Sequence, residues 1–187
     1  MISLPLWWQF SLKYCGKERV TYEHYGNAWR MMIMSTDYKL MAAQLKSLME
    51  DEKNYMPVLS NASAILNDTL DDINWAGFYL VDNGSLLLGP FQGHVACIRI
   101  QPGKGVCGTA YATDTTQLVE DVHQFPGHIA CDSASNSEIV VPIHKDGKVV
   151  AVMDIDSPLL SRFTKEDKEG LEAFAKVIEE ASFTDVE

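Results

Sequence analysis

The sequence contains no CxxC pair and only four cysteines, Cys15, Cys97, Cys107 and Cys131, in 187 residues. Small secreted domains need a denser disulfide framework, and structural zinc sites need cysteines at close spacing. Intervals of ten and 24 residues separate Cys97, Cys107 and Cys131 and match neither pattern. We therefore expect no metal site. We also expect the protein to lie in the cytoplasm, where thiols normally stay reduced.

Clusters of Lys or Arg are also missing, and 26 acidic against 15 basic residues give a formal net charge of −11. A surface of this charge repels phosphate backbones, which argues against nucleic acid as a partner. The apolar stretch at residues 2–10 contains Pro5 and Gln9 and is too short to cross a bilayer. It also lacks the basic start and cleavage site of a secretory signal. We therefore expect no membrane partner.

Residues 1–33 show no sustained helix or strand period, and we expect them to lie outside the main fold of residues 34–187. They carry three tryptophans and a scatter of charges, and a second plausible start follows at Met34. Three interpretations stay open: a true extension, upstream sequence included by an incorrect start codon, or a docking arm.

Apolar residues recur at helical spacing in several segments. The predicted helices cover residues 37–50, with Leu40, Leu45 and Leu48 on the apolar stripe, then 57–70, 106–112 and about 164–182. Ser35-Thr36-Asp37 and Thr164 are the expected N-caps of the first and last helix.

Alternating or continuous apolar runs predict strands at residues 76–81, 85–88, 94–100, 117–119, 138–144 and 148–156. Asp82-Asn83-Gly84 and Asp146-Gly147 are hairpin turn signals. In the strand expected at 94–100, Cys97 shares a face with Val95 and Arg99. The long connection at residues 120–137 is of a length that is usually functional or disordered. Helices around hairpin-connected strands indicate an α+β sandwich.

Three thiols are candidates for chemistry. Cys107 lies just inside a predicted helix start, where the helix dipole should lower its pKa by about one unit or more. Cys131 lies in the long polar connection, after His128 and beside Asp132, and can meet Cys97 if this loop folds over the strand. The alternative that Cys97 and Cys107 are small buried hydrophobic residues stays open.

Several carboxylates are expected to converge near the same place. Asp154 and Asp156 are two residues apart in a strand, so both side chains project from one face. Glu138 begins the hairpin partner of that strand and lies close to the pair, and Asp132 adds a fourth acid beside Cys131. Crowded acids raise one pKa and produce a proton donor. A solvated strand end or a divalent metal site is the alternative.

The stretch Asn74-Trp-Ala-Gly-Phe-Tyr79 places Trp75, Gly77 and Tyr79 on one strand face. Aromatic core packing explains such a pattern well and is expected for Phe78. A Trp/Tyr wall with a glycine gap can equally line a small pocket.

Together these segments resemble the free methionine-(R)-sulfoxide reductases, a family built on the GAF fold. The resemblance extends over about residues 34–183 in family order. The matching stretches are Asn61-Ala-Ser, Ile73-Asn-Trp-Ala-Gly-Phe-Tyr79, Gly89-Pro-Phe-Gln-Gly-His-Val-Ala-Cys97, Gly103-Lys-Gly-Val-Cys-Gly108, Pro126-Gly-His-Ile-Ala-Cys-Asp132, Ser137-Glu-Ile-Val-Val-Pro142 and Asp154-Ile-Asp156.

The resemblance implies an α+β fold with an antiparallel sheet of about six strands, flanked by helices, and a closed pocket for one amino acid. It implies that Cys131 is the nucleophile and Cys97 the resolving thiol. Cys107 also matches a family cysteine and competes for either role. Glu138, Asp154 or Asp156 would donate a proton to the sulfoxide oxygen of the substrate.

The remaining acids, with Asp132, would bind the substrate ammonium, and Trp75 and Tyr79 would pack on the methyl-sulfinyl end. The product would be methionine, with a sulfenic acid and then a disulfide on the protein. By resemblance, thioredoxin would restore the thiols, and no cofactor is needed. A homodimer is compatible with the sequence, which leaves the oligomeric state open.

Two rivals remain, because a fold alone does not settle function. A GAF module that binds a small molecule usually regulates an attached output domain, and none is apparent here; an acidic pocket would also repel phosphate. A thiol redox sensor would use the same cysteines without turning over methionine sulfoxide.

Overall fold

The computed structural model describes residues 36–52, 54–127 and 133–180. The helices and strands of this part are α3 (Tyr38–Leu48), α4 (Tyr55–Thr69), β1 (Trp75–Asp82), β2 (Ser85–Gly93), β3 (Arg99–Ile100), α5 (Gly105–Thr113), β4 (Gln117–Val119), the 3₁₀ turn η1 (Val122–Gln124), β5 (Ser137–Lys145), β6 (Lys148–Ser157) and α6 (Lys165–Glu179). No helix among these residues is long and apolar enough to cross a bilayer.

The strands form one antiparallel sheet in the order β3-β2-β1-β6-β5-β4. Its two long hairpins turn at Asn83-Gly84 and Asp146-Gly147, and both residues of each turn have positive φ. Such turns match the twist of the strands that they join, which is why Asn-Gly and Asp-Gly signal hairpins. The predicted α+β class and six-stranded antiparallel sheet are confirmed.

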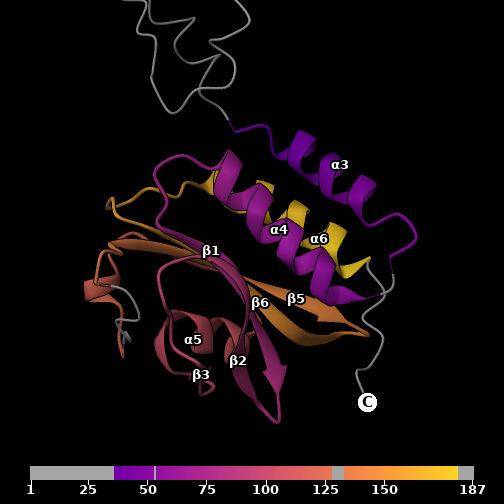
Figure 1. Ribbon diagram of the computed structural model, residues 1–187. Coiled ribbons are helices and arrows are strands. Elements are labelled where there is room, and N and C mark those ends of the chain that lie inside the picture. The colour runs from indigo at the N-terminus through magenta and orange to yellow at the C-terminus, as the bar shows by residue number, and fades with distance from the viewer. Residues whose placement is uncertain (1–35, 53, 128–132, 181–187) are drawn as a thin grey trace, which may run out of the picture. The chain divides into compact units, whose positions relative to one another are not determined.

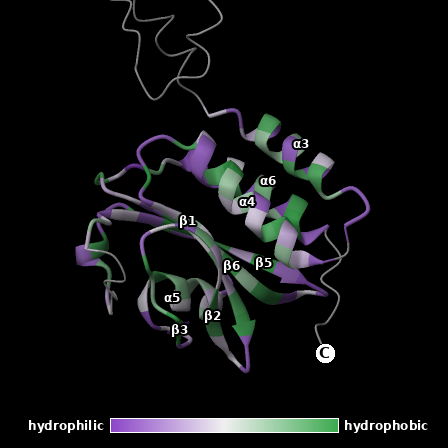
Figure 2. Ribbon diagram, viewed as in Figure 1, coloured by the Kyte–Doolittle hydropathy of each residue, from purple (hydrophilic) through white to green (hydrophobic). Residues whose placement is uncertain are grey.

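Helices cover the sheet unequally (Figure 1): α3, α4 and α6 lie on one side, and α5 lies on the other. Hydrophobic residues are concentrated in the helices and strands, whereas the β1–β2 turn and the connection after α3 are hydrophilic (Figure 2). Successive strand residues point to opposite faces, so the central strands β1, β6 and β5 contribute to two apolar clusters. Met153 and Ile155 of β6 join the cluster beneath the three helices, and Val152 joins the cluster beneath α5.

Helix starts follow local capping chemistry. The Asp37 side chain accepts from the backbone N–H of Leu40, and Thr164 forms a reciprocal capping box with Asp167. The α4 helix begins two residues before the expected Pro57, because Asn54 caps it. In α3 the buried residues are Met41 and Leu45. The prediction that Leu40 and Leu48 belong to the buried stripe is wrong, since both are exposed.

The strand predicted at residues 94–100 is also wrong. β2 continues to Gly93, opposite Trp75, and the segment His94–Ile98 is a loop that returns the chain to the two-residue strand β3. The Trp75 indole N–H donates to the His94 carbonyl at 3.1 Å, and the Leu88 N–H donates to the Ile98 carbonyl at 2.9 Å. These bonds fix both ends of the loop. Because Val95 and Ile98 are exposed, the apolar run at residues 95–98 does not form a buried strand.

Candidate active site

The sheet face beneath α5 carries the residues singled out from the sequence. Glu138 of β5 and Trp75 of β1 both pair with Asp156 of β6, so these three lie in one row across the central strands. Asp154, two residues before Asp156, lies in the next row between Gly77 and Val140. The register thus confirms that Glu138 lies beside the aspartate pair, and that Trp75 and Tyr79 share their face.

Cys107 belongs to α5, the helix that covers this face of the sheet. It is the third residue of α5, which begins at Gly105 (φ 61°) after a turn at Gly103 (φ 73°). At Gly108, a Cβ would lie 2.3 Å from the Gln101 carbonyl oxygen, so only glycine allows the helix this close to the preceding turn. This contact helps to hold the first turn of α5, and with it the Cys107 thiol, against the sheet.

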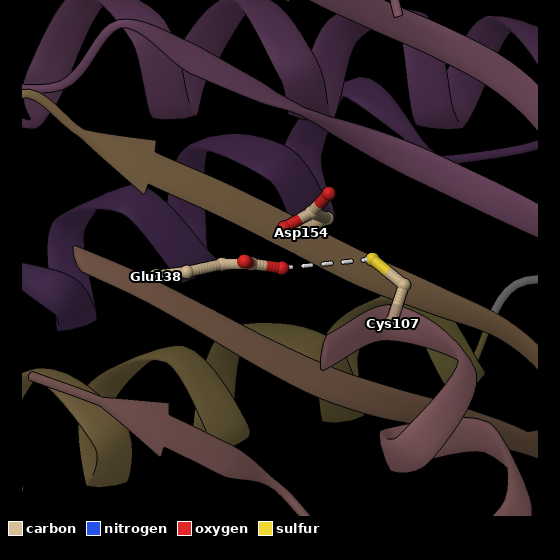
Figure 3. Close-up of side chains that lie close together, drawn as sticks. All are labelled: Cys107, Glu138 and Asp154. Carbon is tan, nitrogen blue, oxygen red and sulfur yellow. Dashed lines mark hydrogen bonds between the residues drawn. The ribbon is translucent and has the colours of Figure 1, made fainter. Parts of the chain in front are cut away.

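Cys107, Glu138 and Asp154 form a compact cluster (Figure 3). The Cys107 thiol donates to Glu138 Oε1 over 3.9 Å, and one donor atom from each residue lies within 4.8 Å of the other two. All three are buried, between 4% and 7% exposed. Asp154 Oδ1 has no hydrogen-bond partner. A buried acceptor without a donor is costly, so this atom is available to a bound group that brings a donor.

The two carboxyls hold protons more tightly than usual. Burial raises the pKa of Asp154 to about 6, although hydrogen bonds with Cys107 and Glu138 oppose the shift. Burial, followed by the charges of Asp154 and Asp156, raises the pKa of Glu138 well above its ordinary value. The sequence analysis expected crowding to raise the pKa of one of these acids; the pKa values are raised, and burial contributes more to this than the neighbouring charges do.

Cys107 is buried, as the alternative of a small buried residue predicted, and the lowered pKa expected from its place at the helix start is wrong. Burial raises the pKa of this thiol well above its ordinary value, and the negative charges of Asp154 and Glu138 raise it further. The helix dipole acts on a group that the sheet has already removed from water, and desolvation of the thiolate outweighs it. Cys107 is thus a neutral thiol that donates to the Glu138 carboxyl group.

Aromatic rings form one wall beside the cluster. The Trp75 ring stacks on Tyr79 with centroids 5.9 Å apart and on Phe91 with centroids 5.2 Å apart. Phe91 was not predicted, because it follows Pro90 in a stretch without a clear period. A Cβ on Gly77 would lie 2.3 Å from the Phe91 Cβ, so Phe91 occupies the expected glycine gap. Burial, then the charge of Asp154, raises the pKa of Tyr79 and keeps its hydroxyl neutral.

Known proteins resemble this chain in sequence and fold. The GAF domain family matches residues 56–181. The free methionine-R-sulfoxide reductase of Escherichia coli is 49% identical over 147 residues, which cover 79% of this chain and 89% of that protein. The enzyme of the same name from Saccharomyces cerevisiae is 50% identical over 141 residues, covering 71% and 78%. The chain belongs to the free methionine-R-sulfoxide reductase family.

A solved structure of this reductase family extends the agreement to three dimensions. The fRMsr of Staphylococcus aureus in complex with substrate is 57% identical, with a TM-score of 0.76 over 79% of this chain and 97% of that one. The GAF fold expected from the resemblance is therefore confirmed.

The other predicted site residues are Cys131, Asp132 and Cys97. Cys131 and Asp132 lie outside the described residues. Cys97 lies partly buried in the loop after β2, packed against the apolar cluster that contains Trp75, Tyr79 and Cys107. Cys97 is disulfide-bonded, whereas Cys107 is a free thiol.

The Cys107, Glu138 and Asp154 cluster is also the one group in the described part of the chain whose donor atoms are close enough to hold a metal ion. A metal binds the deprotonated forms of such ligands. Since the pKa values of all three are raised, an ion would compete with protons here. A neutral acid and a neutral thiol suit hydrogen bonding and proton transfer instead.

Proposed function

We propose that this chain reduces free methionine-(R)-sulfoxide to methionine in the buried site between α5 and the sheet. The observation that carries the proposal is the acid pair Glu138 and Asp154, buried beside an aromatic wall with Asp154 Oδ1 lacking a partner. Membership of the reductase family and the substrate-bound S. aureus relative support it. The catalytic domain corresponds to residues 34–187 and acts in the cytoplasm.

Asp154 and Asp156 are the residues for the substrate ammonium, with Asp132 as a further candidate. An ammonium brings three N–H donors, and a buried acceptor without a donor is stabilised by receiving one. Its positive charge also favours ionised over protonated Asp154. Peptide-bound methionine has no ammonium, which explains a preference for the free amino acid. The stacked rings of Trp75 and Tyr79 offer an apolar surface to the methyl-sulfinyl end.

Cys131 is the proposed nucleophile. Its thiolate attacks the sulfoxide sulfur while an acid protonates the sulfoxide oxygen; the oxygen leaves with the Cys131 sulfur as a sulfenic acid, and methionine is released. Two electrons pass from the cysteine to the substrate sulfur. Cys107 is a poor rival, because its buried thiol stays protonated. Glu138 is the favoured proton donor, since burial and two neighbouring aspartates raise its pKa.

Cys97 is the proposed resolving residue. Its thiol attacks the sulfenic sulfur of Cys131, water leaves, and a disulfide forms. A dithiol such as thioredoxin then reduces that disulfide by exchange, so one sulfoxide and two thiols give methionine, a disulfide and water. The disulfide-bonded state of Cys97 is compatible with this role.

Turnover of separated R and S epimers of free methionine sulfoxide, with dithiothreitol as reductant, tests the proposal. We expect the R epimer alone to be consumed. Cys131→Ser should abolish turnover, and Cys97→Ser should prevent the disulfide. Cys107→Ser should retain the disulfide, and Cys15→Ser, which removes a cysteine without a role in this proposal, serves as the matched control.

If Cys107→Ser alone abolishes turnover, the function stands and the nucleophile is reassigned. If the parent protein consumes neither epimer, the reductase proposal fails, and small-molecule binding by a GAF module or thiol redox sensing becomes the better account. Rapid peroxide oxidation of the thiols without turnover would favour the sensor.

A further inference from the structure

The loop His94–Ile98 has two sides of different character. Ala96 and Cys97 pack inward, against the apolar cluster that also contains Trp75 and Tyr79. Val95 and Ile98, on either side of them in the sequence, are 87% and 73% exposed, and they are the two most exposed large apolar side chains in the described part of the chain. Core packing therefore does not explain them.

The loop is held in place at both ends. The Trp75 indole binds the carbonyl of its first residue, and the Leu88 N–H binds the carbonyl of its last residue. Val95 and Ile98 are thus presented by an anchored segment, with Cys97 between them. A preorganised apolar surface loses little conformational entropy when a partner covers it, which favours binding.

Local charge distinguishes this part of the sequence from the rest. Residues 83–113 contain no Asp or Glu, although the whole chain has 26. The same stretch carries Arg99 and Lys104, of which Arg99 pairs with Asp82 at 2.6 Å. Thiol–disulfide exchange begins with a thiolate, which negative charge repels. The segment that carries Cys97 thus adds no negative charge of its own that would repel an attacking thiolate.

We infer that Val95 and Ile98 form the docking surface of a protein dithiol reductant, whose thiolate attacks the Cys97 sulfur. This inference rests on the proposed function, which leaves Cys97 in a disulfide once per turnover. The fitting partner is a dithiol protein with apolar residues around its reactive thiol, because a small thiol gains nothing from exposed Val and Ile.

The exchange then has a defined direction. The reductant thiolate forms a mixed disulfide with Cys97, and the bond between Cys97 and the proposed nucleophile Cys131 breaks. Cys131 leaves as the thiolate that the next substrate requires. The second reductant thiol attacks the mixed disulfide, releases Cys97 as a thiol and becomes oxidised. Two electrons pass from the dithiol to the protein disulfide.

The double substitution Val95→Asp and Ile98→Asp tests the surface. Turnover of methionine-(R)-sulfoxide would be measured with thioredoxin, thioredoxin reductase and NADPH, and separately with dithiothreitol. We expect kcat/KM for thioredoxin to fall about tenfold, as for loss of an apolar interface residue, with dithiothreitol turnover unchanged. Leu40→Asp, on α3 and 64% exposed, is the matched control and should change neither rate.

Trapping gives a second readout that needs no variant of this chain. A thioredoxin whose second active-site cysteine is serine cannot complete the exchange, so it should remain attached to the oxidised protein. Peptide mass spectrometry is expected to find it on Cys97. Attachment to Cys131 would overturn the inference even if the double substitution disturbed folding.

The outcomes separate the two proposals. Absence of dithiothreitol turnover in the parent protein refutes the proposed function, and with it this inference. Normal dithiothreitol turnover with an unchanged kcat/KM for thioredoxin in the double variant refutes the docking surface alone. A parent dimer that becomes monomeric on the double substitution, with the thioredoxin rate retained, would assign the surface to a second copy of this chain.

Discussion

The two faces of the central sheet share strands, yet only one is purely apolar along β6: the face covered by α5, called the polar face below, buries Glu138 and Asp154 among its apolar side chains. In β6, Met153 and Ile155 lie in the apolar cluster covered by α3, α4 and α6, while Asp154 between them lies on the face covered by α5. Burial of an apolar side chain contributes about 1.5–3 kcal/mol, whereas burial of a carboxyl opposes folding. Apolar burial therefore stabilises the protein on both faces, and on the polar face part of that stability offsets the burial of two acids.

Glu138→Gln should give the largest effect and tests the polar face. A glutamine has a similar shape but cannot donate a proton as an acid. We expect kcat/KM for the R epimer to fall by about 10²-fold or more, the usual contribution of a general acid, with an unchanged or higher unfolding midpoint. Initial rates with dithiothreitol and thermal unfolding measure the two. A lowered midpoint that accounts for the lost rate would make Glu138 a structural residue.

Ile155→Ala tests the apolar face with a residue adjacent to both aspartates. Ile155 is fully buried beneath the helices, so its truncation should cost about 2–5 kcal/mol in the free energy of unfolding. Urea denaturation measures this loss. The folded variant should keep a kcat/KM close to that of the parent. Loss of rate without loss of stability would show that the two faces are not separable.

Asp154→Asn sharpens the comparison through pH. The folded pKa of Asp154, about 6, lies above the ordinary 3.8, so ionisation opposes folding. Stability from the protonated form is complete below pH 3.8 and is lost as the pH rises through about 6. At pH 7 the variant should be more stable than the parent by up to about 3 kcal/mol, and below pH 4 equally stable. Equal unfolding curves at every pH would contradict the buried acid.

His144→Gln should give the smallest effect, because the polar group concerned is largely solvated. His144 contacts Asp114 at 2.6 Å and Glu179 at 2.8 Å. Partial burial lowers its pKa, but the hydrogen bonds and charges of the two acids outweigh this and raise it above 6.5. The stabilisation is complete below pH 6.5 and is lost as the pH rises through the folded pKa.

We expect the parent to exceed this variant in stability by less than about 1 kcal/mol at pH 6, given solvent screening, and the difference to shrink toward pH 9. Thermal unfolding across this range provides the measurement. A difference that grows with pH would have the wrong sign for a histidine held by carboxylates.

The sequence was enough to predict which face of β6 carries the acids, but not the protonation state of Cys107 or the loop at His94–Ile98. Successive side chains of a strand point to opposite faces, so Asp154 and Asp156 could be assigned to one face of β6. The Asp-Gly turn identified the partner strand β5. For Cys107 the sequence left burial and an exposed thiolate both open, because the choice depends on strand residues 31 and more positions away. The loop at His94–Ile98 was not predicted for a similar reason: its consecutive apolar residues resemble a strand, but the chain leaves the sheet after Gly93, where the Trp75 indole N–H binds the His94 carbonyl.

The hydrogen bond from Trp75 to the His94 carbonyl also makes Trp75 a natural fluorescence probe. Trp75 stacks on two aromatic rings, faces the acid cluster and donates to the loop that carries Cys97. The other tryptophans, Trp7, Trp8 and Trp29, all precede residue 34. With these three replaced by phenylalanine, the emission of one indole would report both the arrival of a sulfoxide and the redox state of the neighbouring loop, in real time and without a label.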